Sequence, residues 1–222
     1  MVFRETVGHP AVSGNERPHA MTPFDPASLP HAAAFYAGLP GGFDAHPHCR
    51  VRTAVSREIV TEFPQILAHP GIESSTLALL RQSMEDGEWM RDARGMALRL
   101  LVRDIVFETD AAYFEWYFDI SSRLFAKPFY RVLMYVVSPT LVLLGATRRW
   151  AAFREGSVMS ATVNGNRGTA QLTFPEGLYP PITLGGFGET IRAALAAARA
   201  RNPEVELVEA SGTVGRWRLG WS

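Results

Sequence analysis

The stretch that decides the fold runs from Arg154 to Trp221 and reads REGSVMSATVNGNRGTAQLTFPEGLYPPITLGGFGETIRAALAAARARNPEVELVEASGTVGRWRLGW. Asn164-Gly165-Asn166 provides residues that tolerate the positive φ angles of a tight hairpin. Apolar and polar residues alternate on both sides of it, over 156–163 and 169–174, as they do in half-buried strands. The inward-facing residues that we expect in the second strand are Ala170, Leu172 and Phe174. The unit therefore begins with a β-hairpin.

A helix and a second hairpin complete this unit. Gly185-Gly186-Phe187-Gly188 is expected to form the turn that opens the helix, which continues to about Arg201. Its apolar stripe consists of Phe187, Ile191, Leu195 and Ala198. Two further strands are predicted over 204–210 and 214–221. In the last strand, Trp217, Leu219 and Trp221 share the inward face, while Arg216 and Arg218 face Glu204 and Glu206.

The residues before Arg154 read as helices. Helical spacing of apolar residues predicts helices over 31–36, 50–63, 74–87, 90–107, 111–126 and 138–153. Asp110 and Ser138 are the expected caps of the last two, and Arg91, Arg99 and Arg103 are expected to point outward from the helix over 90–107.

The predicted fold class is therefore α+β, with an N-terminal helical layer packed on a C-terminal ββαββ unit whose four-stranded sheet is mainly antiparallel. We expect one domain over 31–222, with a helical part at 31–153 and the ββαββ unit at 154–222. Residues 1–30 contain five prolines and no periodicity, which predicts a mobile leader. Met1 and Met21 are both candidate initiators.

Composition narrows the classes of function. The 222 residues include 22 basic and 22 acidic side chains, so the net charge is zero and no nucleic-acid partner is expected. The single cysteine, Cys49, is typical of a reducing compartment and predicts a cytoplasmic protein. The longest apolar run, Val132 to Leu144, is interrupted by Ser138-Pro139 and is shorter than the about 20 residues of a membrane span. We therefore expect no membrane span.

The helix over 111–126 is aromatic on most of its faces, which predicts burial or contact with a partner. Because ligand pockets are mostly apolar with a few polar groups, this helix is also the candidate wall of a pocket. The candidate pocket residues are Tyr113, Tyr117, Phe118, Ser121 and Arg123. Plain packing in the core is the alternative interpretation.

Other candidate chemistry is sparse. His46 and His48 are weak metal-ligand candidates, because Cys49 would point to the other side of a strand and zinc needs about four ligands. The Gly185–Gly188 turn lacks the lysine of a phosphate-binding loop and the full dinucleotide fingerprint. No serine, cysteine or carboxylate lies in a recognisable nucleophile or acid–base motif, so the expected catalytic set is empty.

Four motifs resemble a myxobacterial paralogous family of unknown function (domain-of-unknown-function family 2378). They are Leu39-Pro40-Gly41-Gly42, Arg148-Arg149-Trp150-Ala151-Ala152-Phe153, Gly185-Gly186-Phe187 and Arg216-Trp217-Arg218-Leu219-Gly220-Trp221. The resemblance covers about Leu39 to Trp221. That family is distantly similar to vinyl-reductase-like, haem–nitric-oxide and TRAPP-type (Golgi-tethering) ligand-binding domains. The resemblance implies an apolar pocket between helices and sheet for a lipid or a tetrapyrrole.

The chain departs from the haem–nitric-oxide pattern at a specific place. Those domains hold haem propionates with a Tyr-x-Ser-x-Arg motif that follows a ligating histidine. Ser121-Ser122-Arg123 matches only the second half, because Tyr117 precedes Ser121 by four residues. Every histidine also lies before residue 70. The resemblance to these domains is therefore not extended to haem, and the cofactor is left open.

Three hypotheses follow. The first is a non-enzymatic small-molecule-binding or sensory domain that holds an apolar ligand between the aromatic helix and the sheet. The second is a protein–protein interaction module that forms a homodimer through the aromatic helix or an edge strand, without a ligand. The third, a metal-dependent enzyme built on His46 and His48, has the least support.

Overall fold

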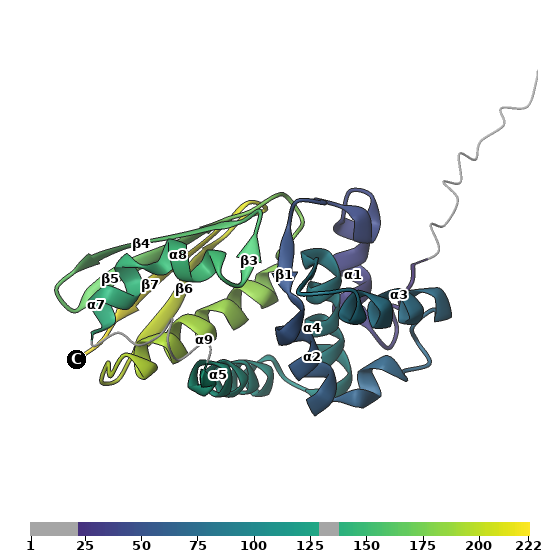
Figure 1. Ribbon diagram of the computed structural model, residues 1–222, viewed down its shortest axis with the longest axis horizontal. Helices are drawn as coiled ribbons and strands as arrows, with labels where there is room; N and C mark the ends of the chain where they lie inside the picture. Colours follow the sequence, from purple (N-terminus) through teal and green to yellow (C-terminus); the bar gives the residue numbers. More distant parts are fainter. Residues whose placement is uncertain (1–21, 129–137) are drawn as a thin grey trace, which may run out of the picture.

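The computed structural model describes residues 22–128 and 138–222, and the protein has two unequal sheets and a set of short helices (Figure 1). The N-terminal half contains α1 (Pro30–Gly38), β1 (Arg50–Arg52), α2 (Thr53–Glu62), α3 (Ser74–Glu85), β2 (Trp89–Arg91), α4 (Asp92–Val106) and α5 (Asp110–Ala126), with the 3-10 turns η1 (Gly42–Asp44) and η2 (Pro64–Leu67). The C-terminal half contains α7 (Pro139–Leu144), α8 (Ala146–Ala151), β3 (Arg154–Glu155), β4 (Val158–Asn164), β5 (Arg167–Thr173), α9 (Pro181–Ala197), β6 (Glu204–Ala210) and β7 (Val214–Gly220). The α+β fold class is confirmed.

The larger sheet has the strand order β4-β5-β7-β6, and every neighbouring pair is antiparallel. Helix α9 lies across one face of this sheet (Figure 1). The residues on that face are buried, as the alternation predicted: Ala170, Leu172, Trp217 and Leu219. Trp221 lies beyond β7 and is only half-buried.

The register of the second hairpin differs in part from the prediction. Arg218 pairs with Glu206 at 2.9 Å, as expected. Glu204 lies opposite Gly220, and Arg216 pairs with Glu209 at 2.6 Å, because a bulge between Leu207 and Glu209 places Glu209 opposite Arg216 in the position that Val208 would otherwise take. A bulge adds one residue to one strand, which a strict period of two cannot anticipate.

The smaller sheet, in the order β2-β1-β3, was not predicted. The helices expected to begin at residues 50 and 90 begin at Thr53 and Asp92, and each is preceded by a three-residue strand. Val51 and Met90 have a helical spacing to the next apolar residues, but their backbones pair with each other across the sheet. Apolar spacing therefore placed the helices correctly and their first residues wrongly.

The glycines at 185–188 do not form the predicted turn. Helix α9 begins at Pro181, so these glycines lie within it. A Cβ atom on Gly185 would lie 2.5 Å from the Phe114 ring, and one on Gly186 would lie 2.7 Å from the Tyr117 ring. The glycines therefore let α9 approach α5 closely.

Two helix boundaries also differ from the prediction. The cap of α5 is Thr109 instead of Asp110, with the Ala112 amide donating to the Thr109 hydroxyl at 3.2 Å. The helix expected over 138–153 is split at Gly145 into α7 and α8, although Ser138 caps α7 as predicted. The split follows from Arg149, whose guanidinium lies over Gly145 and donates to the Leu141 and Val142 carbonyls at 3.2 and 3.1 Å.

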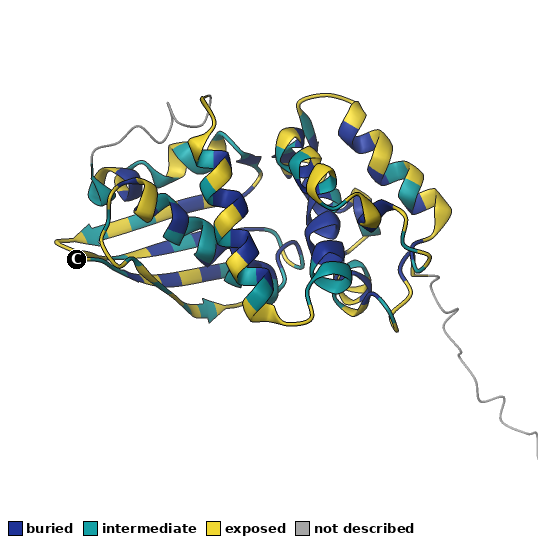
Figure 2. Cartoon of the chain, turned by 90° about the horizontal axis from the view of Figure 1, so that it is seen from below, coloured by how far each residue is buried: buried dark blue, intermediate teal, exposed yellow. Residues whose placement is uncertain are grey.

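One contiguous cluster of buried side chains extends from Phe24 to Leu219 (Figure 2). Phe24 is 1% exposed and bridges Ile72, so the packed chain begins earlier than the leader boundary predicted at residue 30. Residues 1–21 of that leader, and residues 132–137 of the apolar run from Val132, lie outside the described residues. No helix in the described part of the chain is long and apolar enough to cross a membrane.

Candidate functional site

A cavity of about 160 Å³ lies where the N-terminal helices meet the ββαββ unit. Helix α5 forms one side of it and packs along α9, whose residues line the adjacent side. Strand β1 and α2 contribute Val51, Val55 and Ile59, and α7, α8 and β4 close the rest. Most lining residues are aliphatic or aromatic, so the cavity favours an apolar molecule over water.

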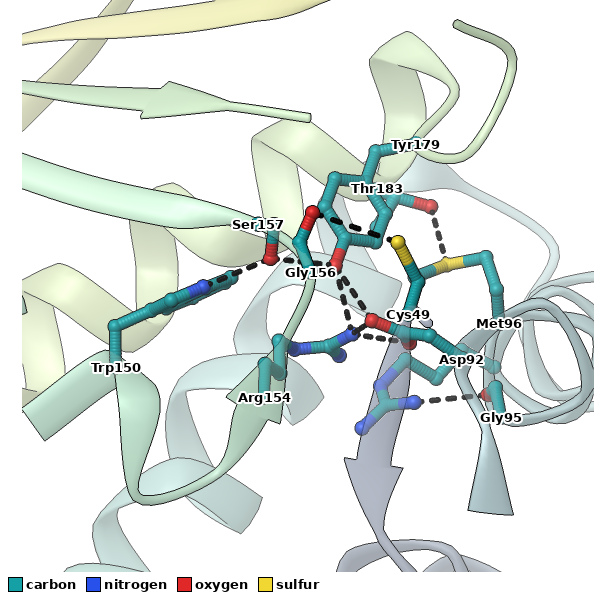
Figure 3. A network of polar contacts seen from close by, with 11 residues as sticks. Cys49, Asp92, Gly95, Met96, Trp150, Arg154, Gly156, Ser157, Tyr179 and Thr183 are labelled. Atoms are coloured by element: carbon teal, nitrogen blue, oxygen red, sulfur yellow. Dashed lines mark hydrogen bonds and ion pairs between the residues drawn. The ribbon is translucent and has the colours of Figure 1, made fainter. Parts of the chain in front are cut away.

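A buried polar network connects the two halves beside this cavity (Figure 3). Arg154, from β3, pairs through Nη1 with both carboxylate oxygens of Asp92, the first residue of α4. Tyr179 donates from its hydroxyl to Asp92 Oδ2 at 2.5 Å and lies 3.1 Å from the Ser157 hydroxyl. Trp150 donates from Nε1 to that same serine at 2.9 Å. Arg154 also lines the cavity, so this network forms part of its boundary.

The ionisation of the network follows from its burial. Burial alone would lower the pKa of Arg154, but the charge and hydrogen bond of Asp92, together with the Tyr179 and Tyr117 hydroxyls, outweigh it and raise the pKa of Arg154 above its ordinary value. Burial, and then the Asp92 charge, raise the pKa of Tyr179. Asp92 and Arg154 thus form an ion pair, and Tyr179 stays protonated as a hydrogen-bond donor.

Arg99 on α4 is a second buried arginine on the cavity, and its environment differs. The residue is 4% exposed and was expected to point outward. Within residues 22–128 and 138–222 its one hydrogen bond runs from Nη1 to the Gly95 carbonyl at 2.8 Å, and no carboxylate pairs with it. Because α4 is buried on nearly all sides from Gly95 to Val102, no solvent-facing side remains for this arginine.

Two aromatic residues of the cavity lining have a buried polar atom without a partner. Tyr117 and Trp116 both line it, and both are at least nine-tenths buried. Neither Tyr117 Oη nor Trp116 Nε1 has a hydrogen-bond partner in the described chain. A buried polar atom without a partner is uncommon and requires an explanation.

The five predicted pocket residues separate into two groups. Tyr117 and Ser121 line the cavity, and the Ser121 hydroxyl lies 3.0 Å from that of Thr190 on α9. Tyr113 is buried against Tyr117 and outside the cavity lining, and burial raises its pKa well above the usual value. Phe118 packs under Arg192, and Arg123 forms an exposed ion pair with Glu62.

The segment with His46, His48 and Cys49 is not arranged as a set of metal ligands. The rings of His46 and His48 lie 6.5 Å apart, and Nε2 of His46 is 2.9 Å from the Glu176 carbonyl oxygen. Cys49 is buried against Gly156. The described residues contain no group of three or more His, Cys, Asp or Glu side chains that could hold a metal ion.

No family model matches the chain, and no curated protein matches it. Solved structures do resemble it. A structure described as "Structural insights into the molecular mechanism of H-NOX activation" has a TM-score of 0.51 at 9% identity, covering 77% of this chain and 94% of that one. The fold is similar to that of H-NOX domains. The Fe(II) unliganded H-NOX protein from K. algicida matches with a TM-score of 0.48 at 9% identity, covering 77% and 96%.

This likeness concerns the fold alone, and the kinship to the myxobacterial paralogous family stays a prediction. Haem, which the H-NOX fold implies, does not fit the site. The volume of about 160 Å³ is close to the 150 Å³ of an engineered cavity that takes one benzene molecule, far less than a macrocycle needs. No histidine or cysteine is among the lining residues described, leaving Tyr117 and Met159 as the only side chains of a haem-ligating type there.

Proposed function

We propose that this protein is a non-enzymatic, small-molecule-binding domain of the sensory kind, and that it holds an apolar ligand in the cavity between α5, α9 and β1. The single observation that carries this proposal is the cavity itself. It is lined by core side chains from both halves of the chain and is partly open to the surface. A well-packed interior leaves few voids larger than a water molecule, so a void of this size has a functional explanation.

The location of the cavity explains how ligand binding could change the conformation of the protein. The cavity is bounded by α4 and β1 on one side and by α9 and β4 on the other. A ligand that contacts both halves stabilises the arrangement in which they are closed, and it shifts the population towards that arrangement. The aromatic residues of α5 are buried or half-buried, so this helix does not present the exposed apolar face that a dimer built on it would need.

The proposal is tested with toluene and 1-hexanol as probes, measured by ligand-observed NMR and by the thermal unfolding midpoint. Wild-type protein is expected to bind both and to unfold at a higher temperature in their presence. Ala194→Phe places a ring in the cavity and is expected to abolish both effects, because Ala194 lines it. The control is Ala196→Phe on the exposed side of the same helix, which should bind like wild type. Equal binding by both variants would refute the proposal.

A further inference from the structure

Arg99 carries a positive charge that the described chain does not neutralise. It lies on the cavity at 4% exposure, and its one hydrogen bond is to an uncharged carbonyl. Among the residues that the structure describes, Arg154 is the other arginine in a comparably buried position, and it is compensated by Asp92. A buried cation without a counter-charge loses its hydration and gains no ion pair, so it destabilises the fold. Such a residue is retained where something other than the fold requires it.

The sequence limits what could supply the counter-charge from within the chain. Residues 129–137 read FYRVLMYVV and contain no carboxylate. Outside the described residues the chain has two acidic side chains, Glu5 and Glu16. A bound anion is the alternative that the cavity itself suggests.

The other unpaired atoms have matching chemistry. The indole N–H of Trp116 can only donate, and the hydroxyl of Tyr117 has no acceptor in the described chain. The Ser56 hydroxyl is also buried without a partner, and it and Arg99 Nη1 would each lie 3.5 Å from a Cβ atom on Gly95. These groups are a guanidinium, a phenol, an indole and an alcohol. The phenol, indole and alcohol atoms have almost no accessible surface, so Arg99 is the group of this set that a molecule in the cavity could reach, and its charge is balanced by a group that accepts hydrogen bonds and carries negative charge.

We propose that the ligand is a small monocarboxylate, with its carboxylate on Arg99 and an apolar body of about one ring or a short chain in the rest of the cavity. This inference rests on the proposed function, because it assigns the head group of the ligand held at that same site. One uncompensated cation calls for one negative charge. The aliphatic and aromatic remainder of the lining calls for the apolar body.

The test compares charged and neutral probes of equal size in the full chain. Benzoate is compared with benzyl alcohol, and hexanoate with 1-hexanol, by titration calorimetry. Wild-type protein is expected to bind each carboxylate about tenfold or more tightly than its alcohol, the discrimination expected for a charge-assisted hydrogen bond. Arg99→Gln should remove this preference and leave the affinity for the alcohols within about twofold.

Matched variants isolate the charge at Arg99. Arg123→Gln makes the same chemical change at an exposed arginine outside the cavity and should keep the preference. Arg99→Lys keeps the positive charge and should keep the preference for carboxylates, which provides a second test if Arg99→Gln fails to fold. Glu5→Gln/Glu16→Gln should leave the affinities unchanged.

The outcomes separate the two proposals. Equal affinity for acids and alcohols in wild type, with both lost in Ala194→Phe, would overturn the carboxylate inference and leave the proposed function standing. Tighter carboxylate binding in Glu5→Gln/Glu16→Gln would also overturn it, because an internal counter-ion would then occupy Arg99. Absence of binding by all four probes would overturn both proposals.

Discussion

Replacing Asp92 with asparagine tests whether the two halves of the protein are held together by a buried charge. Asp92 is fully buried and accepts hydrogen bonds from Arg154 and Tyr179. Asparagine retains the size of the side chain and removes its charge, so Arg154, 4% exposed, is left as an uncompensated cation. Breaking a buried pair from one side costs about 3–5 kcal/mol. We expect Asp92→Asn to lower the free energy of unfolding by about that amount.

The assay is urea unfolding followed by tryptophan fluorescence, for which the chain has five tryptophans. A double-mutant cycle with Arg154→Met separates the interaction between Asp92 and Arg154 from the other effects of each substitution. Asp92→Asn and Arg154→Met together leave no unpaired charge. The double variant should therefore be more stable than the sum of the two single changes implies, by about 2 kcal/mol or more.

Glu206→Gln provides the matched control. It makes the same carboxylate-to-amide change in the pair with Arg218, whose side chains are 65% and 69% exposed. Exposed pairs contribute about 0–1 kcal/mol and weaken with salt, whereas a buried pair is screened much less. If Asp92→Asn costs no more than Glu206→Gln, or if its cost disappears at high salt, then the buried pair is not what joins α4 to β3.

Three further predictions concern the same region. Gly186→Ala should destabilise the protein by about 1–3 kcal/mol and weaken probe binding, because its Cβ would lie 2.7 Å from the Tyr117 ring. The control is Gly38→Ala, whose Cβ would have no atom within 4 Å. It should change the free energy of unfolding by less than about 1 kcal/mol in the same denaturation assay. Burial, reinforced by the Asp92 charge, raises the pKa of Cys49 from 9.0 to about 11. Between those pH values the folded state holds more protons than the unfolded state, so the free energy of unfolding should fall by about 2–3 kcal/mol from pH 9 to 11. The variant Cys49→Ala should show a shallower decline. Arg99→Met should raise the free energy of unfolding of the ligand-free protein by about 1 kcal/mol or more, measured by urea unfolding without probe, and a loss of stability would show that Arg99 supports the fold.

Periodicity was sufficient to predict the ββαββ unit because its inward and outward residues alternate without interruption. Ala170, Leu172 and Trp217 are buried where the period of two places them. Periodicity failed where pairing with a distant segment determines the backbone conformation. Arg50 to Arg52 are extended because β2 and β3 pair with them on either side, and these partners lie far away in sequence.

The candidate site shows the same limit. Tyr117 and Ser121 line the cavity, and the aromatic character of α5 was the signal that indicated them. Arg99 was missed because an arginine in an amphipathic helix is ordinarily taken to face water. A signal was available in Gly95, one helical turn earlier. Its missing side chain admits Val51 of β1, whose Cγ1 would lie 2.6 Å from a Cβ atom there, and this close packing of α4 indicates a turn without a solvent-facing side.

The two buried arginines have opposite relations to stability, and this difference distinguishes a structural charge from a functional one. Arg154 and Asp92 are both supplied by the chain, so their mutual attraction offsets the loss of hydration whether or not a ligand is present. Arg99 has no such partner in the described chain, so its loss of hydration remains until an anion arrives. Part of the binding free energy of that anion therefore restores stability that the ligand-free fold lacks. Under the proposed assignment, the fold is therefore most stable with its ligand bound.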